Sequence, residues 1–230
     1  MKISSFRNKI NNVIWLFPFL LFTGLSFIFN EGLSVNPNHP NEDEHYTNAL
    51  MNNERGNVDF IADYHFDIRF HELNDIIAVK EKIIWRNKTN FKTNEIYLHL
   101  YANAYRNNRT LFASVYNITE EAETGINIEE LTVNGETKQL EVVRPDVDNK
   151  YDSTVARIAL SNFVLPGDSV EININYTLKI PISIKRFGKA RGADFYFVSQ
   201  WYPKVGVFEK GKWVCNQYFP RLNFYSDFGR

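Results

Sequence analysis

The sequence predicts an all-β protein, a twisted antiparallel β-sandwich preceded by one N-terminal hydrophobic helix. Three observations predict this class. Apolar residues alternate with polar ones in residues 64–70, they do so again in residues 170–178, and Asn134-Gly135 separates two further apolar runs. A period of two is typical of strands with one buried face, and Asn-Gly suits the turn of a two-residue hairpin. Strands of this kind bury their apolar faces by packing as two sheets.

The composition indicates a folded domain and argues against a nucleic-acid partner. Hydrophobic residues make up 44% of the 230 residues and aromatic residues 15%, which is ample for a core. The net charge is −1, and without residues 1–34 it is −3, because 23 basic residues then face 26 acidic ones. No nucleic-acid partner is expected from this charge. The single Cys215 cannot form an internal disulfide and is expected to be a small buried residue.

The N-terminus has the pattern of an export signal. Three basic residues precede an apolar run at residues 13–29, and acidic residues follow it. Such a charge order sends the rest of the chain out of the cytoplasm. We therefore expect residues 1–34 to be a signal peptide or a signal anchor, with membrane attachment through residues 13–29 if the segment is not cleaved. The body would be periplasmic, extracellular or anchored to the membrane.

A polar linker and a β domain follow. Residues 35–59 are rich in Asn, Pro, His and Glu and show no apolar period, which predicts a tether. Residues 60–230 form the β-sandwich domain. Its expected strands cover residues 64–70, 76–85, 94–100, 126–133, 138–143, 154–160 and 170–178, with turns at residues 73–75, 134–135 and 165–168. No convincing helix is seen after the N-terminal segment.

Catalytic motifs are absent from the sequence. His71-Glu72-Leu73-Asn74-Asp75 starts like a zinc-binding His-Glu-x-x-His, but Asp75 stands in place of the second His. There is no Gly-x-Ser-x-Gly, and Cys215 lacks an evident His partner. We therefore assign no catalytic residue, no metal ligand and no cofactor to this chain.

The C-terminal part is unusually aromatic. Twelve aromatic residues lie in residues 195–228, among them Trp201, Tyr202 and Trp213. A surface with such side chains normally meets a partner. We expect the C-terminal edge of the domain to be incomplete, with the aromatic side chains exposed.

Five segments of residues 64–229 resemble the N-terminal β domain of the aminopeptidase N-like (gluzincin) zinc metallopeptidases, especially the bacterial members. The segments are Tyr64-His65-Phe66-Asp67-Ile68, Ile84-Trp85-Arg86-Asn87-Lys88-Thr89, residues 96–104, Leu165-Pro166-Gly167-Asp168, and Gln200-Trp201-Tyr202-Pro203 together with Trp213 and residues 224–229. Their order and spacing carry the resemblance.

The resemblance implies a saddle-like domain that packs on a catalytic domain and lines its substrate cleft. In the family that catalytic domain binds zinc and a peptide substrate, and its Gly-x-Met-Glu-Asn and His-Glu-x-x-His motifs do not occur here. Close relatives of aminopeptidase N often have Gln-x-Glu-Pro where this chain has Gln200-Trp201-Tyr202-Pro203. Tyr202 cannot supply the charge of that Glu to a substrate amine, so Gln200 and Tyr202 are candidates for the rim of the cleft only.

Two functions remain open at the level of sequence. The chain is either the non-catalytic N-terminal portion of an exported zinc aminopeptidase, inactive alone, or a complete membrane-tethered β-sandwich that binds a peptide, glycan or partner protein through its aromatic end. The resemblance favours the first.

Overall fold

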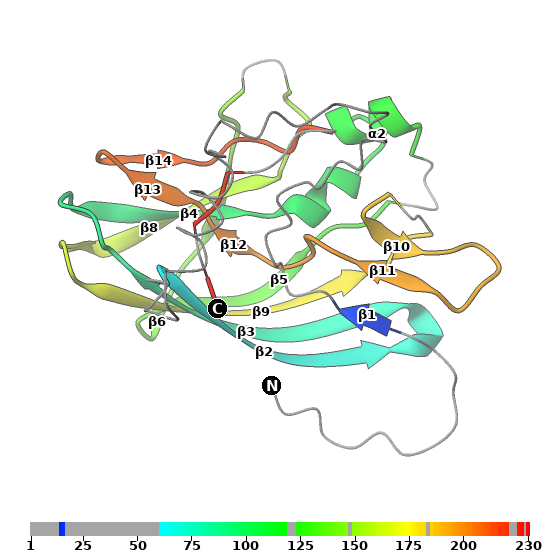
Figure 1. Ribbon diagram of the computed structural model, residues 1–230, viewed down its shortest axis with the longest axis horizontal. Helices are drawn as coiled ribbons and strands as arrows, with labels where there is room; N and C mark the ends of the chain where they lie inside the picture. The colour runs from blue at the N-terminus through cyan, green and yellow to red at the C-terminus, as the bar shows by residue number, and fades with distance from the viewer. Residues whose placement is uncertain are drawn as a thin grey trace, which may run out of the picture. The chain divides into compact units, whose positions relative to one another are not determined.

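The computed structural model describes residues 14–16, 60–118, 123–146, 149–182, 185–220, 225–227 and 229–230, all within one compact unit. Four sheets hold its strands (Figure 1). The largest has the order β2-β3-β9-β5-β6, and the next has the order β12-β4-β8-β7. Buried side chains from these two sheets belong to one hydrophobic cluster, so the predicted all-β, sandwich-like fold is confirmed.

The strands have the following bounds. The five-stranded sheet contains β2 (Ala62–His71), β3 (Ile76–Arg86), β9 (Ser169–Lys179), β5 (Asn127–Val133) and β6 (Glu136–Thr137). The four-stranded sheet contains β12 (Lys204–Val205), β4 (Thr93–His99), β8 (Val155–Val164) and β7 (Leu140–Val143). The smaller sheets are β1 (Ile14–Leu16), β11 (Tyr196–Val198) and β10 (Phe187–Lys189), and the hairpin of β13 (Val207–Glu209) with β14 (Lys212–Val214).

The alternation seen in the sequence sets which side chains reach the core. In β3, every second residue from Ile77 to Trp85 is buried, and in β9 the same holds from Val170 to Leu178. The two strands pair antiparallel along their whole length, with Ile83 opposite Ile172. Successive side chains of a strand point to opposite faces, so one face of this sheet packs on the core and the other meets water.

The Asn134-Gly135 turn forms as predicted, but the hairpin around it is shorter. Both turn residues have positive φ, 49° and 81°, as a type I′ turn requires. Only Glu136 and Thr137 then pair back on β5. The rest of the expected partner strand, Leu140–Val143, instead pairs with β8 in the other sheet. The chain therefore crosses between the sheets within residues 138–139.

Helical segments were missed by the sequence analysis. The 3-10 helices η1 (Glu72–Asn74) and η2 (Tyr101–Tyr105) and the helix α2 (Leu111–Tyr116) all lie in loops between strands. The side chain of Thr110 accepts a hydrogen bond from the Ala113 backbone N–H at 3.1 Å, and Asn117 ends α2 in the left-handed conformation. A helix of six residues is too short to show a 3.6-residue period, so its caps were the only signal.

The N-terminal segment differs from the prediction where it is described. Residues 14–16 form the short strand β1, which pairs parallel with β11, whereas a hydrophobic helix was expected. Ile and Trp favour extended backbone, and pairing with β11 satisfies their backbone groups. The rest of residues 1–34 and the linker at residues 35–59 lie outside the described residues. Within the part of the chain that is described, no helix is long and apolar enough to span a bilayer.

Asn87 joins two loops at one end of the sandwich. It is fully buried, and its side-chain amide donates to the backbone carbonyls of Phe91 at 2.7 Å and Val164 at 3.2 Å. Its backbone N–H donates to the carbonyl of Asp168, and its own carbonyl accepts from the N–H of Gly167. The loop after β3 is thus fixed to the predicted turn at residues 165–168.

Candidate functional site

Gln200 and Tyr202, the predicted cleft residues, lie between β11 and β12. Gln200 has a positive φ of 54°, and its side-chain oxygen is buried with no hydrogen-bond partner among the described residues. Tyr202 is half-buried, and its ring makes edge contacts with Phe66 at 5.1 Å and Tyr64 at 5.6 Å. The two residues therefore sit on the edge of the five-stranded sheet, against strand β2.

Tyr202 belongs to a group of five aromatic rings, which we call the Tyr202 cluster. Trp201 contacts Tyr202 at 5.5 Å, Phe66 at 5.5 Å and Tyr176 at 6.4 Å. The cluster consists of Tyr64, Phe66, Tyr176, Trp201 and Tyr202. Edge-to-face and tilted contacts of this kind stabilise aromatic groups beyond the area that they bury. Burial raises the pKa of the Tyr202 phenol to about 12, so the phenol is neutral at physiological pH.

A buried carboxyl group lies beside this cluster. Glu81 is 2% exposed and lies on the core face of β3, opposite Phe66 in β2 and Ile174 in β9. The hydroxyl of Tyr176 faces this carboxyl group and its hydrogen bonding opposes the effect of burial on the pKa, although no hydrogen bond of ordinary geometry joins the two groups. Burial raises the pKa of Glu81 well above its ordinary value, since a charge in this apolar setting would be poorly solvated.

Glu81 could have been found in the sequence by counting positions. It lies an even number of positions from Ile77, Val79, Ile83 and Trp85, so its side chain is on the same face of the strand. It is the one acidic residue on that apolar face. The apolar pattern predicts a strand over residues 76–85 but does not by itself mark Glu81 as buried. The neighbours of Glu81, from β2, β9 and the loop before β12, could not be deduced without the pairing of the strands.

The aromatic C-terminal part is not the exposed patch that was expected. Trp201 is 5% exposed, and Tyr202 and Trp213 are both half-buried. Trp213 packs between Trp85 at 5.3 Å, Tyr97 at 5.8 Å and Phe208 at 5.0 Å. The expectation is wrong because the hairpin β13–β14 folds back on the chain's own four-stranded sheet, where it covers the outer face.

A polar cavity lies where this hairpin meets the four-stranded sheet. Its volume is about 530 Å³. Its walls carry two aromatic rings, Tyr97 and Trp213, stacked within 23° of parallel. Three cationic side chains, Lys92, Arg144 and Lys212, also line it. A cavity with both aromatic and charged walls can hold a small polar ligand.

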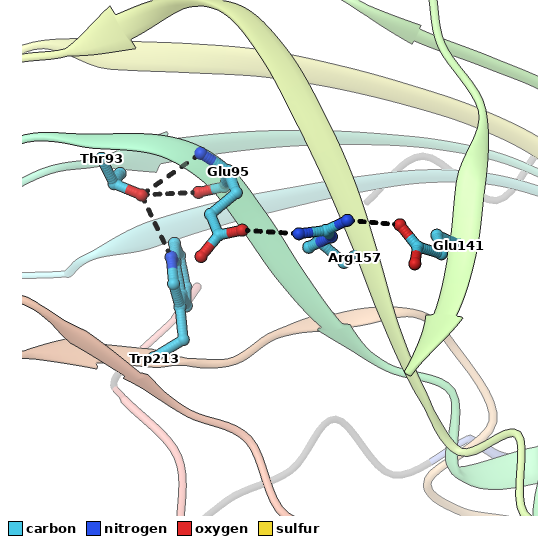
Figure 2. Close-up of polar contacts among 5 residues, drawn as sticks. All are labelled: Thr93, Glu95, Glu141, Arg157 and Trp213. Atoms are coloured by element: carbon cyan, nitrogen blue, oxygen red, sulfur yellow. Dashed lines mark hydrogen bonds and ion pairs between the residues drawn. The ribbon is translucent and has the colours of Figure 1, made fainter. Parts of the chain in front are cut away.

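Figure 2 shows the polar contacts beside this cavity. The indole N–H of Trp213 donates to the hydroxyl of Thr93 at 3.2 Å, and that hydroxyl donates to the Glu95 carbonyl at 2.9 Å. The strand is irregular here, with a shift of register between Thr93 and Glu95. This bulge re-aims the Thr93 side chain, so the hairpin β13–β14 is held to β4 by a hydrogen bond as well as by ring packing.

The carboxylate of Glu95 is already paired. Arg157 in β8 donates to Glu95 at 3.3 Å and to Glu141 in β7 at 2.5 Å (Figure 2). Hydrogen bonding to Glu141, with a further contribution from Glu95, raises the pKa of the Arg157 guanidinium. This network ties three strands together, and its one cation and two carboxylates leave a charge of −1. The lining of the cavity is still net cationic, because Lys92, Arg144 and Lys212 outnumber Glu95, its acidic residue.

His99 and Cys215 meet on the same outer face, although no His partner for Cys215 was evident from the sequence. The sulfur lies 3.4 Å from Nδ1 and 3.5 Å from Nε2 of His99. A sulfur in the ring plane at those distances would overlap the carbon between the two nitrogens, so the sulfur lies over the ring face. This is not the in-plane geometry of proton transfer.

Both groups of this pair are held neutral. Burial lowers the pKa of His99 to about 3 and raises the pKa of Cys215 to about 12. A thiol that does not ionise is a poor nucleophile. We conclude that Cys215 and His99 pack together as neutral groups and do not form a catalytic pair.

No metal site is assembled by the parts of the chain that are described, since no three His, Cys, Asp or Glu side chains there are placed to share an ion. His71 and Glu72, which begin the partial zinc motif, lie exposed at the start of η1.

Comparison with known proteins gives little help. No protein-family profile matches the chain, and no curated protein matches it. Among solved structures, the chain is similar to a Legionella pneumophila protein named as a "putative nutrient binding protein", at 14% identity and a TM-score of 0.32. The match covers 55% of this chain and 42% of that one. A likeness at that level carries no argument about function.

Proposed function

We propose that this chain is the N-terminal, non-catalytic β domain of an exported zinc-dependent aminopeptidase, where it supports a catalytic domain and lines its substrate cleft. The proposal rests on the resemblance of five sequence segments to that family. The catalytic domain would bind the zinc ion and the peptide substrate. Residues 13–29 would direct the protein to the membrane, and would anchor it there if they are not cleaved. Gln200 and Tyr202 would lie at the rim of the cleft.

The observation that supports the proposal is that the five segments touch one another in the fold. Asn87, from the second segment, is hydrogen-bonded to Gly167 and Asp168 of the fourth. Trp213 stacks on Tyr97 of the third segment and packs on Trp85 of the second. The second segment therefore contacts the third, fourth and fifth either directly or through Trp213.

The first and fifth segments also meet. Tyr64 contacts Tyr202, and its phenolic oxygen accepts a hydrogen bond from the Val205 N–H at 3.1 Å. Near the end of the fifth segment, Gly229 forms a parallel bridge with Ala62. The first and fifth segments therefore pack together at strand β2 and the Tyr202 cluster.

Gln200 has a side-chain oxygen without a partner in the described residues, and an amide oxygen can accept a hydrogen bond from a ligand. Because that oxygen is buried, the side chain must turn outward to reach a substrate. Tyr202 offers a phenol that stays protonated and can donate. The two side chains can contribute hydrogen bonds to a substrate but no negative charge.

The test is whether a catalytic domain accompanies this chain. The DNA that follows the codon for Arg230, read in all three frames, should encode Gly-x-Met-Glu-Asn and His-Glu-x-x-His. The 230-residue chain alone, supplied with zinc, should not release amino acids from aminoacyl-p-nitroanilides. Absence of both motifs downstream would count against the proposal, and metal-dependent activity of the purified chain would overturn it.

A second candidate is favoured by the cavity beside Tyr97 and Trp213. A membrane-tethered β-sandwich that binds a peptide, a glycan or a partner protein needs such a recess but no catalytic domain. The two candidates differ in self-sufficiency. A purified protein of residues 60–230 that is monomeric and melts cooperatively favours the binding module, whereas aggregation or loss of fixed tertiary packing favours a domain that lacks its neighbour.

A further inference from the structure

Three turns meet at the end of the sandwich where Asn87 is buried. They are residues 87–92 after β3, residues 163–168 around the end of β8, and residues 209–212 of the hairpin β13–β14, and we call them the turn cluster. Asn87 links the first two through its bonds to Phe91 and Val164. The third is adjacent, because a methyl group added at Gly211 would come within 3.1 Å of the Phe91 ring.

The turn cluster exposes large apolar side chains at its tip. Phe91 is 48% exposed, Phe163 is 51% exposed and Leu165 is 50% exposed. Phe163 and Phe91 are connected through Lys92, whose ammonium group lies 4.3 Å from the centre of the Phe163 ring. Single exposed apolar residues are common on soluble proteins, but three on adjoining turns mark an interaction surface.

The charges around these apolar side chains are mainly positive. The three turns carry four exposed lysines, Lys88, Lys92, Lys210 and Lys212, and two acidic residues, Asp168 and Glu209. Each acidic residue already has a donor: Asp168 accepts from the Leu165 N–H, and Glu209 accepts from the Tyr225 hydroxyl. The cationic cavity described above opens beside the same turns, since Lys92, Gly211 and Lys212 line it together with Arg144.

We propose that the turn cluster docks on an anionic phospholipid bilayer. Phe91, Phe163 and Leu165 would enter the boundary between headgroups and acyl chains, while the lysines and Arg144 would contact the phosphate groups. Apolar side chains favour the acyl-chain layer of a membrane, and cations favour the anionic headgroups above it. Apolar tips surrounded by cations match both layers. An acidic protein surface with an apolar centre would match the same side chains, and the test below distinguishes it from the bilayer. The inference does not depend on the proposed aminopeptidase function.

The test uses the full chain and a local reporter, because residues 13–29 are themselves expected to bind membranes. Leu165→Cys is labelled with an environment-sensitive fluorophore, which leaves the buried Cys215 unmodified. The chain is added to vesicles of phosphatidylglycerol with phosphatidylcholine, or of phosphatidylcholine alone. The emission should shift to the blue with the anionic vesicles, and nitroxide-labelled lipid should quench it. A matched control is Leu73→Cys, which is fully exposed in the η1 turn, far along β2 from the cluster.

Substitutions then separate the two contributions. Exchanging Phe91 and Phe163 for Ser should weaken the docking of the reporter at position 165 on the order of tenfold per residue, because each buried ring favours the membrane. Exchanging Lys92 or Lys212 for Gln should weaken it about fivefold per lysine, and added salt should do the same. Val115→Ser, another exposed apolar residue, should have no effect.

Four results would overturn the inference. The first is that the label at position 165 stays in water with anionic vesicles, and the second is that the label at position 73 shifts equally. The third is a shift at position 165 that neither the lysine substitutions nor salt affects, and the fourth is occupation of Phe91 and Leu165 by a second protein in place of the bilayer.

Discussion

Each of the two main sheets buries a titratable side chain that the fold keeps neutral, but they bury it by different means. Glu81 lies on the inner face of the five-stranded sheet, where the alternation of β3 places it in the core. His99 lies on the outer face of the four-stranded sheet and is buried because Cys215 and the residues after β14 cover it. Folding keeps both groups neutral, and burial is the main cause in each case. The two regions therefore respond to pH in opposite directions. Burial of His99 makes the fold less stable as the pH falls, and burial of Glu81 makes it less stable as the pH rises.

The largest expected effect concerns the acid side. The unfolded chain protonates His99 below its ordinary pKa of 6.5, whereas the folded chain does so only near 3, so stability due to this residue is full above pH 6.5. It falls by about 1.4 kcal/mol per pH unit as the pH drops between those values. His99→Gln should remove this slope from the free energy of unfolding, measured by urea denaturation between pH 4 and pH 8.

The control for this prediction is His65→Gln, since His65 is exposed on the polar face of β2. It should leave the slope unchanged. If the His99 variant keeps the full acid slope, burial of the neutral imidazole does not cause it.

The next effect has the opposite sign, because Glu81 lowers the stability of the fold as the pH rises. Because the folded chain has a raised pKa at Glu81, stability due to this group is full below the ordinary pKa of 4.5 and is lost as the pH rises toward the folded value. Over that window the loss is about 1.4 kcal/mol per pH unit. Glu81→Gln, which is neutral at every pH, should therefore gain stability over the native chain as the pH is raised from 5 to 8.

The matched variant is Glu129→Gln in β5, because Glu129 is exposed in the same sheet. Urea denaturation of both variants at several pH values makes the comparison. A Glu81→Gln variant that follows the native pH profile would show that the buried carboxyl is ionised in the folded chain.

A smaller effect concerns the cover over the outer face. Thr93→Val leaves the indole N–H of Trp213 without its partner, which should cost about 1–3 kcal/mol of stability if the indole stays buried. Hydrogen exchange of the β13–β14 amides should quicken more than that of β3. In a double-mutant cycle with Trp213→Phe, a coupling of about 1 kcal/mol is expected, and a coupling near zero would mean that ring packing alone holds the hairpin.

The smallest effect concerns the surface network of Arg157. Glu141→Gln removes an exposed ion pair with β8 and should lower the melting temperature only slightly, by an amount that high salt abolishes. Thermal denaturation at low and high salt measures it. Unfolding of this variant would show that the ion pair of Arg157 with Glu141 contributes far more stability than an exposed pair normally does.

Local patterns in the sequence were enough to predict much of the five-stranded sheet. Alternation located β2, β3 and β9, and the Asn-Gly dipeptide located a turn whose two residues both have positive φ. These features depend on neighbours in the chain. The crossing of Leu140–Val143 to the other sheet depends on which distant strand offers an edge, and no local pattern encodes that choice.

The candidate site was harder to predict for the same reason. The resemblance alone names Gln200 and Tyr202 as rim residues, and the ring contacts of Tyr202 with Tyr64 and Trp201 follow only from the fold. Sequence analysis expected Trp213 to be exposed because the count of aromatic residues says nothing of what covers them. The pairing of Cys215 with His99 joins positions 116 residues apart and leaves no local trace.

The buried Asn87 has a practical consequence for producing the protein. Asn87-Lys88-Thr89 matches the acceptor pattern for N-linked glycosylation. The folded chain needs the Asn87 amide for two backbone hydrogen bonds and leaves it no exposure. A sugar attached before folding in a eukaryotic secretion host would occupy the space and the donors that join two loops. A bacterial host avoids this lesion and is the appropriate source of folded material.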